Sequence, residues 1–528
     1  MTQPTALGSL MLAFEGTTLP EDALARLRSA PSAGVTLFRS LNVETPGQVR
    51  ELAASIQRAA GGSDARRGPA LVAADQEGGQ LLALGAGATP FAGAMALGAA
   101  GDPALAERVA RAVGLECAAM GVNVVYGPVC DLATNPANPA IGIRSFGDDP
   151  TAVGALVAAT VRGLQSSGVA AALKHFPGLG DVAADSHHAL PVLEADVARL
   201  EGRELAPFRA GIGAGARVVM SAHLAVPGLT GDAALPATLS RAVMTGLLRD
   251  RLGFDRVSIT DALDMGALGD GSGQGAAAAA ALDAGIDLLL TAADPVARAR
   301  IERGIAGAVA DARSTDRVAA LRAWLAGFEQ PELGVVGCDD HRALARELAT
   351  RSLTLVRDED GLLPLRVRSG ARLAAIQPRP TDQTPADTSA SVAPGLASAL
   401  RGRFERVDQF VVDHAPSRAA IAAAREAVRD HDAIVLGTTA AFIEPAQAAL
   451  AEAILDLGRP TVTVSLRTPF DLAAYPAAGC HVAAYGILGP TLVGLAAALA
   501  GDAPFTGRLP AAIPGLYPTG HGLTALPA

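Results

Sequence analysis

Residues 170–178 read AAALKHFPG, a short apolar run that ends in two ionisable residues, a proline and a glycine. Ala170–Leu173 form a continuous apolar run, which is typical of a strand buried on both faces of a parallel sheet. Lys174 and His175 then place two ionisable side chains at the end of that strand, before Pro177 and Gly178 interrupt it. Polar residues at the carboxyl ends of parallel barrel strands are typical of an active site. The stretch therefore predicts a buried strand, 170–175, that delivers functional side chains.

Similar short apolar runs, bounded by Gly, Pro or Asp, lie on both sides of this strand. Together they make about eight candidate strands, which is the number a (β/α)8 barrel requires: 9–14, 34–39, 70–75, 122–129, 170–175, 217–223, 256–261 and 286–291. Ala-rich segments with helical periodicity separate them, among them 45–60, 103–121 and 195–213. The alternation predicts an α/β protein with a TIM-type catalytic barrel over residues 1–335.

A second region begins near Cys338. A helix followed by a strand is predicted over 339–355, with residues 336–350 as the linker helix. Further strands are expected at 373–377, 406–412, 433–438 and 461–465, and a helix at 444–457. These are too few strands for another barrel, so residues 351–528 are predicted to form a smaller α/β sandwich domain. The polar, Pro-rich stretch 378–391 is interpreted as a mobile loop or as an insertion that lines a site.

The composition limits the class of ligand. Half of the residues are hydrophobic and 18% are charged, so a large core is feasible. The formal net charge is −10 and no basic cluster with interleaved aromatics occurs, which argues against nucleic acid as a partner. No apolar run approaches ~20 residues and no basic segment precedes an apolar one at the N-terminus, so no membrane partner and a cytoplasmic location are expected. The four cysteines lie far apart and suggest neither a disulfide framework nor a zinc site.

Ionisable side chains follow several predicted strands: Asp75, Asp131, Lys174, His175, His223 and Asp261, with Arg144 in a loop. Carboxylates, imidazoles and two cationic donors suit glycoside cleavage, which needs a carboxylate on one side of the sugar and a proton donor on the other. Asp131 is predicted to be structural, as a cap of the next turn. His223 is expected either to line the sugar pocket or to be buried and hydrogen-bonded. No cofactor is implied, although the cluster Asp185-Ser186-His187-His188 leaves zinc binding open.

Five motifs in this chain resemble, in the same order, those of the family 3 glycoside hydrolases in their β-N-acetylglucosaminidase branch. The longest is LKHFPGLGDVAADSHHALP, which starts at Leu173 and is similar to that branch's signature KHFPGHGD followed by DSHxxLP. The others are DQEGG (75–79), IGIRSFG (141–147), ITDALDM (259–265) and GRLPAAIPGLYP (507–518). The resemblance runs along nearly the whole chain.

The resemblance implies a division of roles among the candidate residues. Asp261 corresponds to the nucleophile that forms a covalent glycosyl-enzyme intermediate, and Asp185 with His187 to the acid/base dyad. The residues that correspond to the sugar-binding groups are Asp75, Arg144, Lys174 and His175, and we add His223 as a candidate. The implied activity is retaining removal of terminal β-linked N-acetylglucosamine from peptidoglycan fragments or chito-oligosaccharides. A small-molecule or oligosaccharide substrate is therefore the expected partner, and a homodimer is possible.

The chain departs from the family pattern at several positions. Leu179 replaces a usual His, Gln80 an Arg and Val182 a Thr. Ala262 replaces the second Asp of the usual pair that begins with the nucleophile, and Asp264 is the less favoured candidate for the nucleophile. Three other functions stay open: a β-glucosidase or β-xylosidase of the same fold, a phosphorylase in which phosphate replaces water, and a non-catalytic sugar-binding protein. The phosphorylase is considered because a His acid/base lacks the carboxylate charge that would repel an anionic acceptor.

Overall fold

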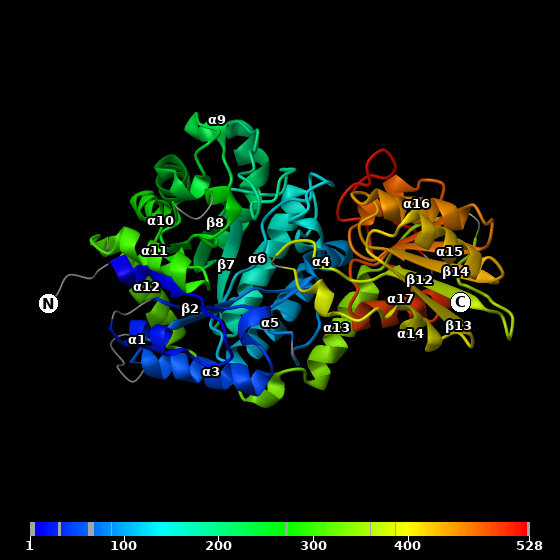
Figure 1. The fold of residues 1–528 in the computed structure, drawn as a ribbon, viewed down its shortest axis with the longest axis horizontal. Coiled ribbons are helices and arrows are strands. Elements are labelled where there is room, and N and C mark those ends of the chain that lie inside the picture. The colour runs from blue at the N-terminus through cyan, green and yellow to red at the C-terminus, as the bar shows by residue number, and fades with distance from the viewer. Residues whose placement is uncertain are drawn as a thin grey trace.

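The computed structural model describes residues 6–29, 33–61, 68–85, 87–269, 273–309, 311–359, 361–385 and 387–524. Two domains lie side by side along the long axis of the molecule (Figure 1). The first contains an eight-stranded parallel sheet and the second a six-stranded sheet. The predicted order, a barrel followed by a smaller α/β sandwich, is confirmed.

The first sheet closes on itself into a barrel. Its strands follow the order β10-β1-β2-β3-β6-β7-β8-β9, and a parallel bridge between Ile259 and Leu288 joins the two ends. The strands are short and buried: β1 (Leu10–Leu12), β2 (Gly34–Leu37), β3 (Leu71–Ala74), β6 (Val124–Val125), β7 (Ala170–Phe176), β8 (Val218–Ser221), β9 (Val257–Ile259) and β10 (Leu289–Leu290). Each lies within its predicted run, except that β7 extends to Phe176. Their carboxyl ends therefore meet at one mouth of the barrel.

Several barrel helices begin in the same way, with a side chain that caps the helix followed by a proline. The cap accepts hydrogen bonds from backbone N–H groups of the first turn, and proline at the first helical position leaves no N–H unsatisfied. The capping residues are Thr45 of α3 (Pro46–Ala59), Asp102 of α5 (Pro103–Ala119), Asp149 of α6 (Pro150–Ser166) and Asp294 of α11 (Pro295–Ile305). These local signals explain why α3 and α5 start where the sequence indicated.

Two predicted elements are shorter or less regular than expected. The run 122–129 forms a strand only at Val124–Val125, because Pro128 has no N–H to donate to a ladder. The segment 195–213 is not one helix: it divides into α7 (Val197–Arg199), a π-helical turn at Leu200–Glu204 and α8 (Ala206–Gly213). The break precedes Pro207, which cannot continue the hydrogen-bond pattern of a preceding helix.

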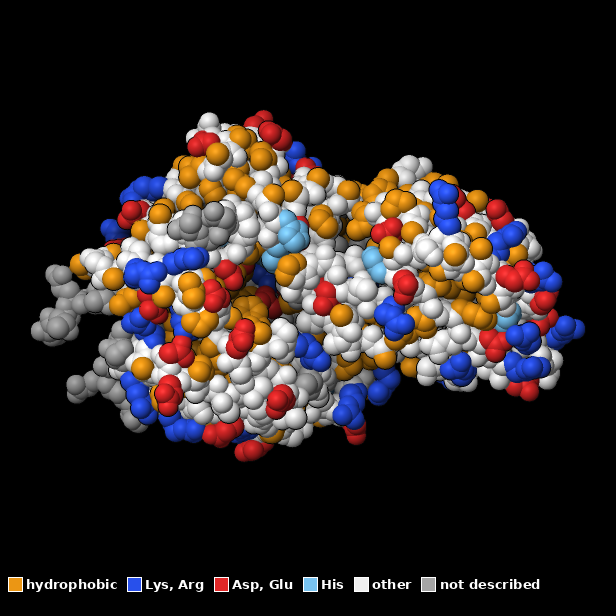
Figure 2. Space-filling view, in the orientation of Figure 1, with side chains coloured by type: hydrophobic (Ala, Val, Ile, Leu, Met, Phe, Trp, Pro, Cys, Tyr) orange, Lys and Arg blue, Asp and Glu red, His pale blue; other side chains and the backbone are white. Residues whose placement is uncertain are grey.

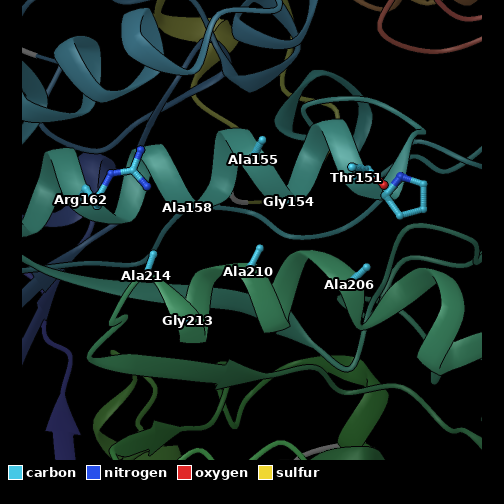
Figure 3. A pocket seen from close by; sticks show the side chains of 10 residues that line it. Thr151, Gly154, Ala155, Ala158, Arg162, Ala206, Ala210, Gly213 and Ala214 are labelled. Atoms are coloured by element: carbon cyan, nitrogen blue, oxygen red, sulfur yellow. The ribbon is translucent and has the colours of Figure 1, made fainter.

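Helices α6 and α8 pack through small side chains. A Cβ at Gly154 would lie 3.2 Å from Ala210 Cβ, which shows how closely the two backbones approach. Alanine and glycine along the solvent side leave an open groove between these helices (Figure 3). The groove lies on the outer surface of the barrel and has no ionisable group other than Arg162 along it.

The second domain is a three-layer sandwich. Its sheet has the order β11-β16-β15-β14-β12-β13, in which only β11 is antiparallel to its neighbour. The strands are β11 (Thr354–Asp358), β12 (Leu373–Pro378), β13 (Val407–Val412), β14 (Ala433–Thr438), β15 (Thr461–Ser465) and β16 (Cys480–Ala483). Helices α15 (Arg418–Val428) and α16 (Pro445–Leu455) cover one face, with α14 (Leu396–Arg401) and α17 (Gly489–Ala500) on the other (Figure 1).

The two domains are joined by packing as well as by the chain. Helix α13 (Asp339–Ser352) packs against α4 (Ala94–Ala100) and α5 of the barrel and against α17 of the second domain. The C-terminal segment returns to the barrel, where Pro510 O accepts a hydrogen bond from Asp148 N at 3.0 Å. Within the described ranges, no helix is long and apolar enough to cross a membrane.

Candidate active site

A pocket of about 830 Å³ opens at the carboxyl ends of the barrel strands. The face shown in Figure 2 is hollowed over the barrel domain, and acidic, basic and histidine side chains surround the opening. Six of the predicted site residues line it: Asp75, Arg144, Lys174, His175, His187 and Asp261. The pocket is large enough for more than one sugar ring.

Lys174 and Arg144 are held by one buried carboxylate, that of Glu77. Arg144 donates two hydrogen bonds to Glu77, from Nε and Nη2 at 2.8 Å each, and Lys174 Nζ lies 2.5 Å from Glu77 Oε1. Lys174 also pairs with Asp75. Burial would raise the pKa of Glu77, but the two cations outweigh it and lower this pKa to about 2. Glu77 is therefore ionised and fixes the two donors, which are predicted sugar ligands.

His175 is fixed by Asp131, which was expected to cap a turn. Instead, the Asp131 carboxylate lies 2.7 Å from His175 Nδ1 and accepts a hydrogen bond from Leu179 N at 2.6 Å. His175 Nε2 lies 3.4 Å from Arg144 Nη2. Asp131 thus orients the imidazole and the loop after β7, and it does not line the pocket.

Asp185 and His187 form a hydrogen-bonded pair on the loop that follows β7. His187 Nδ1 lies 2.7 Å from Asp185 Oδ1, and the same oxygen accepts the His187 backbone N–H at 2.9 Å. Burial alone would lower the pKa of His187, but the hydrogen bond and charge of Asp185 outweigh it, so this pKa is raised. The imidazole can therefore hold a proton near neutral pH and release it, which suits both general-acid and general-base steps.

This loop is docked on the segment that follows β9. Gly266 N donates to His187 O at 3.1 Å, and Ala267 N donates to Ser186 O at 3.0 Å. A Cβ at Gly266 would lie only 2.7 Å from His187 O, so the close approach requires glycine. The loop bearing His187 and the segment after Asp261 are thus connected by main-chain hydrogen bonds.

Asp261 lies two residues after the end of strand β9 and lines the pocket. Burial would raise the pKa of its carboxyl, but His175, His223, the N–H of Ala262 and His187 lower it. For Asp264, in contrast, burial and the negative charge of Asp261 raise the pKa. Asp261 is therefore the more fully ionised of the two carboxylates, as a nucleophile must be.

His223 differs from its predicted role as a sugar ligand. It is fully buried, and its two ring nitrogens lie 2.8 Å from Thr238 Oγ1 and 3.0 Å from Ala262 O. It is not among the residues that line the pocket. The structure corrects this assignment: both nitrogens are occupied, so His223 supports the segment that follows Asp261 and does not contact the ligand space.

The second domain forms part of the pocket wall. Its stretch 378–391, described except for residue 386, contributes Asp382, Pro385, Asp387 and neighbouring residues. Thr388 N donates to Gln80 O at 2.8 Å, and Arg467 Nη2 pairs with Asp387 at 2.7 Å while also contacting Gln80 Oε1. The interpretation of this stretch as a site-lining insertion agrees with its position.

Two features of the site were not predicted from the sequence. One is Glu77, and the other is the contact of Arg467 with Asp387 and with Gln80 of the barrel. Glu77 could have been found, because Asp75 and Glu77 are two residues apart in an extended segment and so point to the same side. The partners of Arg467 are remote in sequence, and no local signal identifies them. In the described ranges, no group of three His, Cys, Asp or Glu side chains is arranged to hold a metal ion, and that includes the Asp185–His188 cluster.

The mouth of the barrel holds an ionised carboxylate, a protonatable histidine and a set of fixed cationic donors. This combination defines the class of a carbohydrate-cleaving barrel enzyme. The chain matches the glycosyl hydrolase family 3 N-terminal domain over residues 15–321. It belongs to this family and is a glycoside hydrolase.

Relatives match along most of the chain. It is 31% identical to beta-hexosaminidase A of Pseudoalteromonas piscicida, over 94% of this chain and 92% of that protein. It is 30% identical to a beta-N-acetylglucosaminidase/beta-glucosidase of Cellulomonas fimi, over 84% of this chain and 83% of that protein. The solved structure of a family 3 beta-N-acetylglucosaminidase from Paenibacillus sp. str. FPU-7 is 33% identical, with a TM-score of 0.90 over 97% of this chain and 98% of that one.

Proposed function

We propose that the protein is a retaining β-N-acetylglucosaminidase that removes terminal β-linked N-acetylglucosamine from peptidoglycan fragments or chito-oligosaccharides in the cytoplasm. The observation that carries the proposal is the position of an ionised Asp261 in the same pocket as the Asp185–His187 pair. The names of the relatives support the choice of N-acetylglucosamine.

In the proposed first step, an Asp261 carboxylate oxygen attacks C1 of the sugar. The C1–O bond to the leaving group breaks, and His187 gives its proton to the departing oxygen. In the second step, His187 takes a proton from water, whose oxygen attacks C1 and releases Asp261. Asp185 keeps the imidazole oriented and stabilises its charged form in both steps. Asp75, Arg144, Lys174 and His175 hold the hydroxyl groups of the sugar.

A β-glucosidase is the second candidate, because one relative carries both activities in its name. The discriminating experiment measures nitrophenol release from the β-N-acetylglucosaminide and the β-glucoside side by side, between pH 5 and 8. Strong preference for the acetamido sugar supports the proposal, and faster cleavage of the glucoside overturns it.

Two controls belong to that experiment. Added phosphate that stimulates turnover and yields sugar 1-phosphate identifies a phosphorylase. Binding of N-acetylglucosamine without release from either substrate identifies a non-catalytic sugar-binding protein.

His187→Ala and Asp261→Ala are each expected to lose more than about 100-fold of the activity, the usual size of a general acid/base or nucleophile effect.

A further inference from the structure

A cluster of charged side chains holds the stem of the acid/base loop, residues 177–191, outside the pocket. Asp181 pairs with Arg199 through Oδ2, and its Oδ1 lies 3.6 Å from Arg203 Nη2. Arg199 Nε and Nη2 also donate to Glu204 Oε1, at 3.2 Å each. We call Asp181, Arg199, Arg203 and Glu204 the stem clamp. None of these four residues lines the pocket, so the stem clamp does not contact the sugar.

The cations of the stem clamp come from an irregular piece of helix. Leu205 N donates to Leu200 O at 2.9 Å, a bond that spans five residues and closes the π-helical turn after Arg199. Turns of this kind are frequent at functional sites. Arg199 and Arg203 are four residues apart on this segment, so both guanidinium groups reach the same carboxylate, that of Asp181.

Glu204 anchors Arg199 from the buried side of the stem clamp. The Glu204 side chain is 5% exposed, and a buried carboxylate is stable only when it is paired. Glu204 also packs against the start of the loop, since a Cβ at Gly178 would lie 3.1 Å from Glu204 Cβ. The side chains of Asp181 and Arg199 are 25% and 32% exposed, so water screens their attraction less than that of a pair on the open surface.

The backbone of the stem is fixed as far as the stem clamp. Asn138 Nδ2 donates to Leu179 O at 2.8 Å, and a Cβ at Gly180 would lie 1.9 Å from Leu132 O. Asp181 follows directly, and residues 183–184, between it and the acid/base dyad, are exposed. The position of the dyad therefore depends on the stem clamp on one side and on the docked tip of the loop on the other.

We propose that Arg199 is a positioning residue for bond cleavage. Through Asp181 it holds the loop where His187 reaches the leaving-group oxygen, and it takes no part in the proton transfer. This inference rests on the proposed function, in which His187 is the acid/base. It predicts a residue outside the pocket whose loss weakens proton donation and leaves both the sugar-binding groups and the proton affinity of His187 unchanged.

The test uses Asp181→Asn, Arg199→Met and the double variant, with kcat/KM measured for chitobiose and for the nitrophenyl N-acetylglucosaminide. In each single variant kcat/KM for chitobiose is expected to fall at least about 10-fold, because a displacement of about 1 Å can cost about 100-fold. The nitrophenyl glycoside should change by less than about 2-fold, because nitrophenolate leaves without a proton.

Three further results separate positioning from a general loss of structure. The alkaline limb of the kcat/KM profile should stay at its pH, because Asp185 keeps its charge. The double variant should be no worse than the more affected single variant, because both changes break one contact. Arg199→Lys should retain part of the activity on chitobiose, because it keeps the charge but not the planar fork.

Arg162→Met is the matched control, because Arg162 is an exposed arginine of α6 that pairs with Glu107. Amide hydrogen exchange measures the loop independently of catalysis: residues 177–191 should exchange faster in Asp181→Asn and Arg199→Met than in the control. Unchanged exchange in the loop, equal losses for the two substrates or a displaced alkaline limb would overturn the inference. Failure of the unmodified protein to cleave either substrate would instead contradict the proposed function, and the exchange rates would still decide whether the stem clamp holds the loop.

Discussion

Replacing Asp185 by Asn tests whether the Asp185 carboxylate raises the pKa of His187, the proposed acid. Asp185 accepts two hydrogen bonds from His187, at Nδ1 and at the backbone N, and its charge raises the pKa of the imidazole. Asparagine keeps the shape of the loop but removes that charge. The pKa of His187 then falls, so the protonated acid is lost at a lower pH than in the unmodified protein.

The size of the effect follows from the contact that is weakened. A hydrogen bond to a charged group contributes about 1.5–3 kcal/mol, which corresponds to about 10- to 100-fold in the proton affinity of His187. The alkaline limb of the kcat/KM profile is therefore expected to move to lower pH. The loss is expected to be larger for chitobiose than for the nitrophenyl glycoside, because a sugar alcohol needs protonation to leave and nitrophenolate does not.

The assay records kcat/KM for both substrates from pH 5 to 9, with His188→Gln as the control. His188 is the exposed neighbour of His187, and it influences Asp185 through its charge, whereas His187 also donates two hydrogen bonds to that carboxylate. An alkaline limb that stays in place in Asp185→Asn, or equal losses for the two substrates, would refute the assignment of His187 as the acid.

Glu77→Gln removes the charge that anchors Arg144, so kcat/KM should fall about 100-fold through displaced sugar ligands, and thermal unfolding should show a loss of up to about 3–5 kcal/mol. Wild-type-like kinetics would contradict the anchoring role. Gly266→Ala inserts a Cβ 2.7 Å from His187 O, so the His187 loop must shift, kcat should fall and stability should drop by about 1–3 kcal/mol; an unchanged kcat would show that the loop adapts. Arg467→Met breaks the buried contacts between the domains, and KM for a disaccharide should rise more than KM for the nitrophenyl glycoside. Parallel changes would argue against a second-domain role in the pocket.

The barrel was predictable because its strands are buried on both faces, which leaves short apolar runs with polar residues at the carboxyl ends. Strand β16 was not predicted, because His481 interrupts the apolar pattern of its sequence. In the structure this His is buried, with its ring nitrogens 2.9 Å from Thr463 Oγ1 and Ser465 Oγ of the neighbouring strand. Burial lowers the pKa of His481 to about 3, so it is a neutral core residue that local hydropathy cannot identify.

The site was predictable to the extent that its residues follow strands or lie in long motifs. Six of the eight site residues that the sequence indicated line one pocket, and Asp185 is hydrogen-bonded to one of them. His223 was misjudged because its position at a strand end did not reveal that Thr238 and Ala262 occupy its ring. The composition of the stretch 378–391 indicated a mobile loop or a site-lining insertion, but its contacts and those of Arg467 with Gln80 join residues hundreds of positions apart, which no spacing in the sequence indicates.

Trapping the covalent intermediate tests directly whether Asp261 is the nucleophile. The protein is incubated with a 5-fluoro N-acetylglucosaminyl fluoride, which slows release of the sugar, and is then digested and mapped by mass spectrometry. We expect an N-acetylglucosaminyl adduct on the carboxylate of Asp261. An adduct on Asp264, or continued turnover with no adduct on either residue, would contradict it.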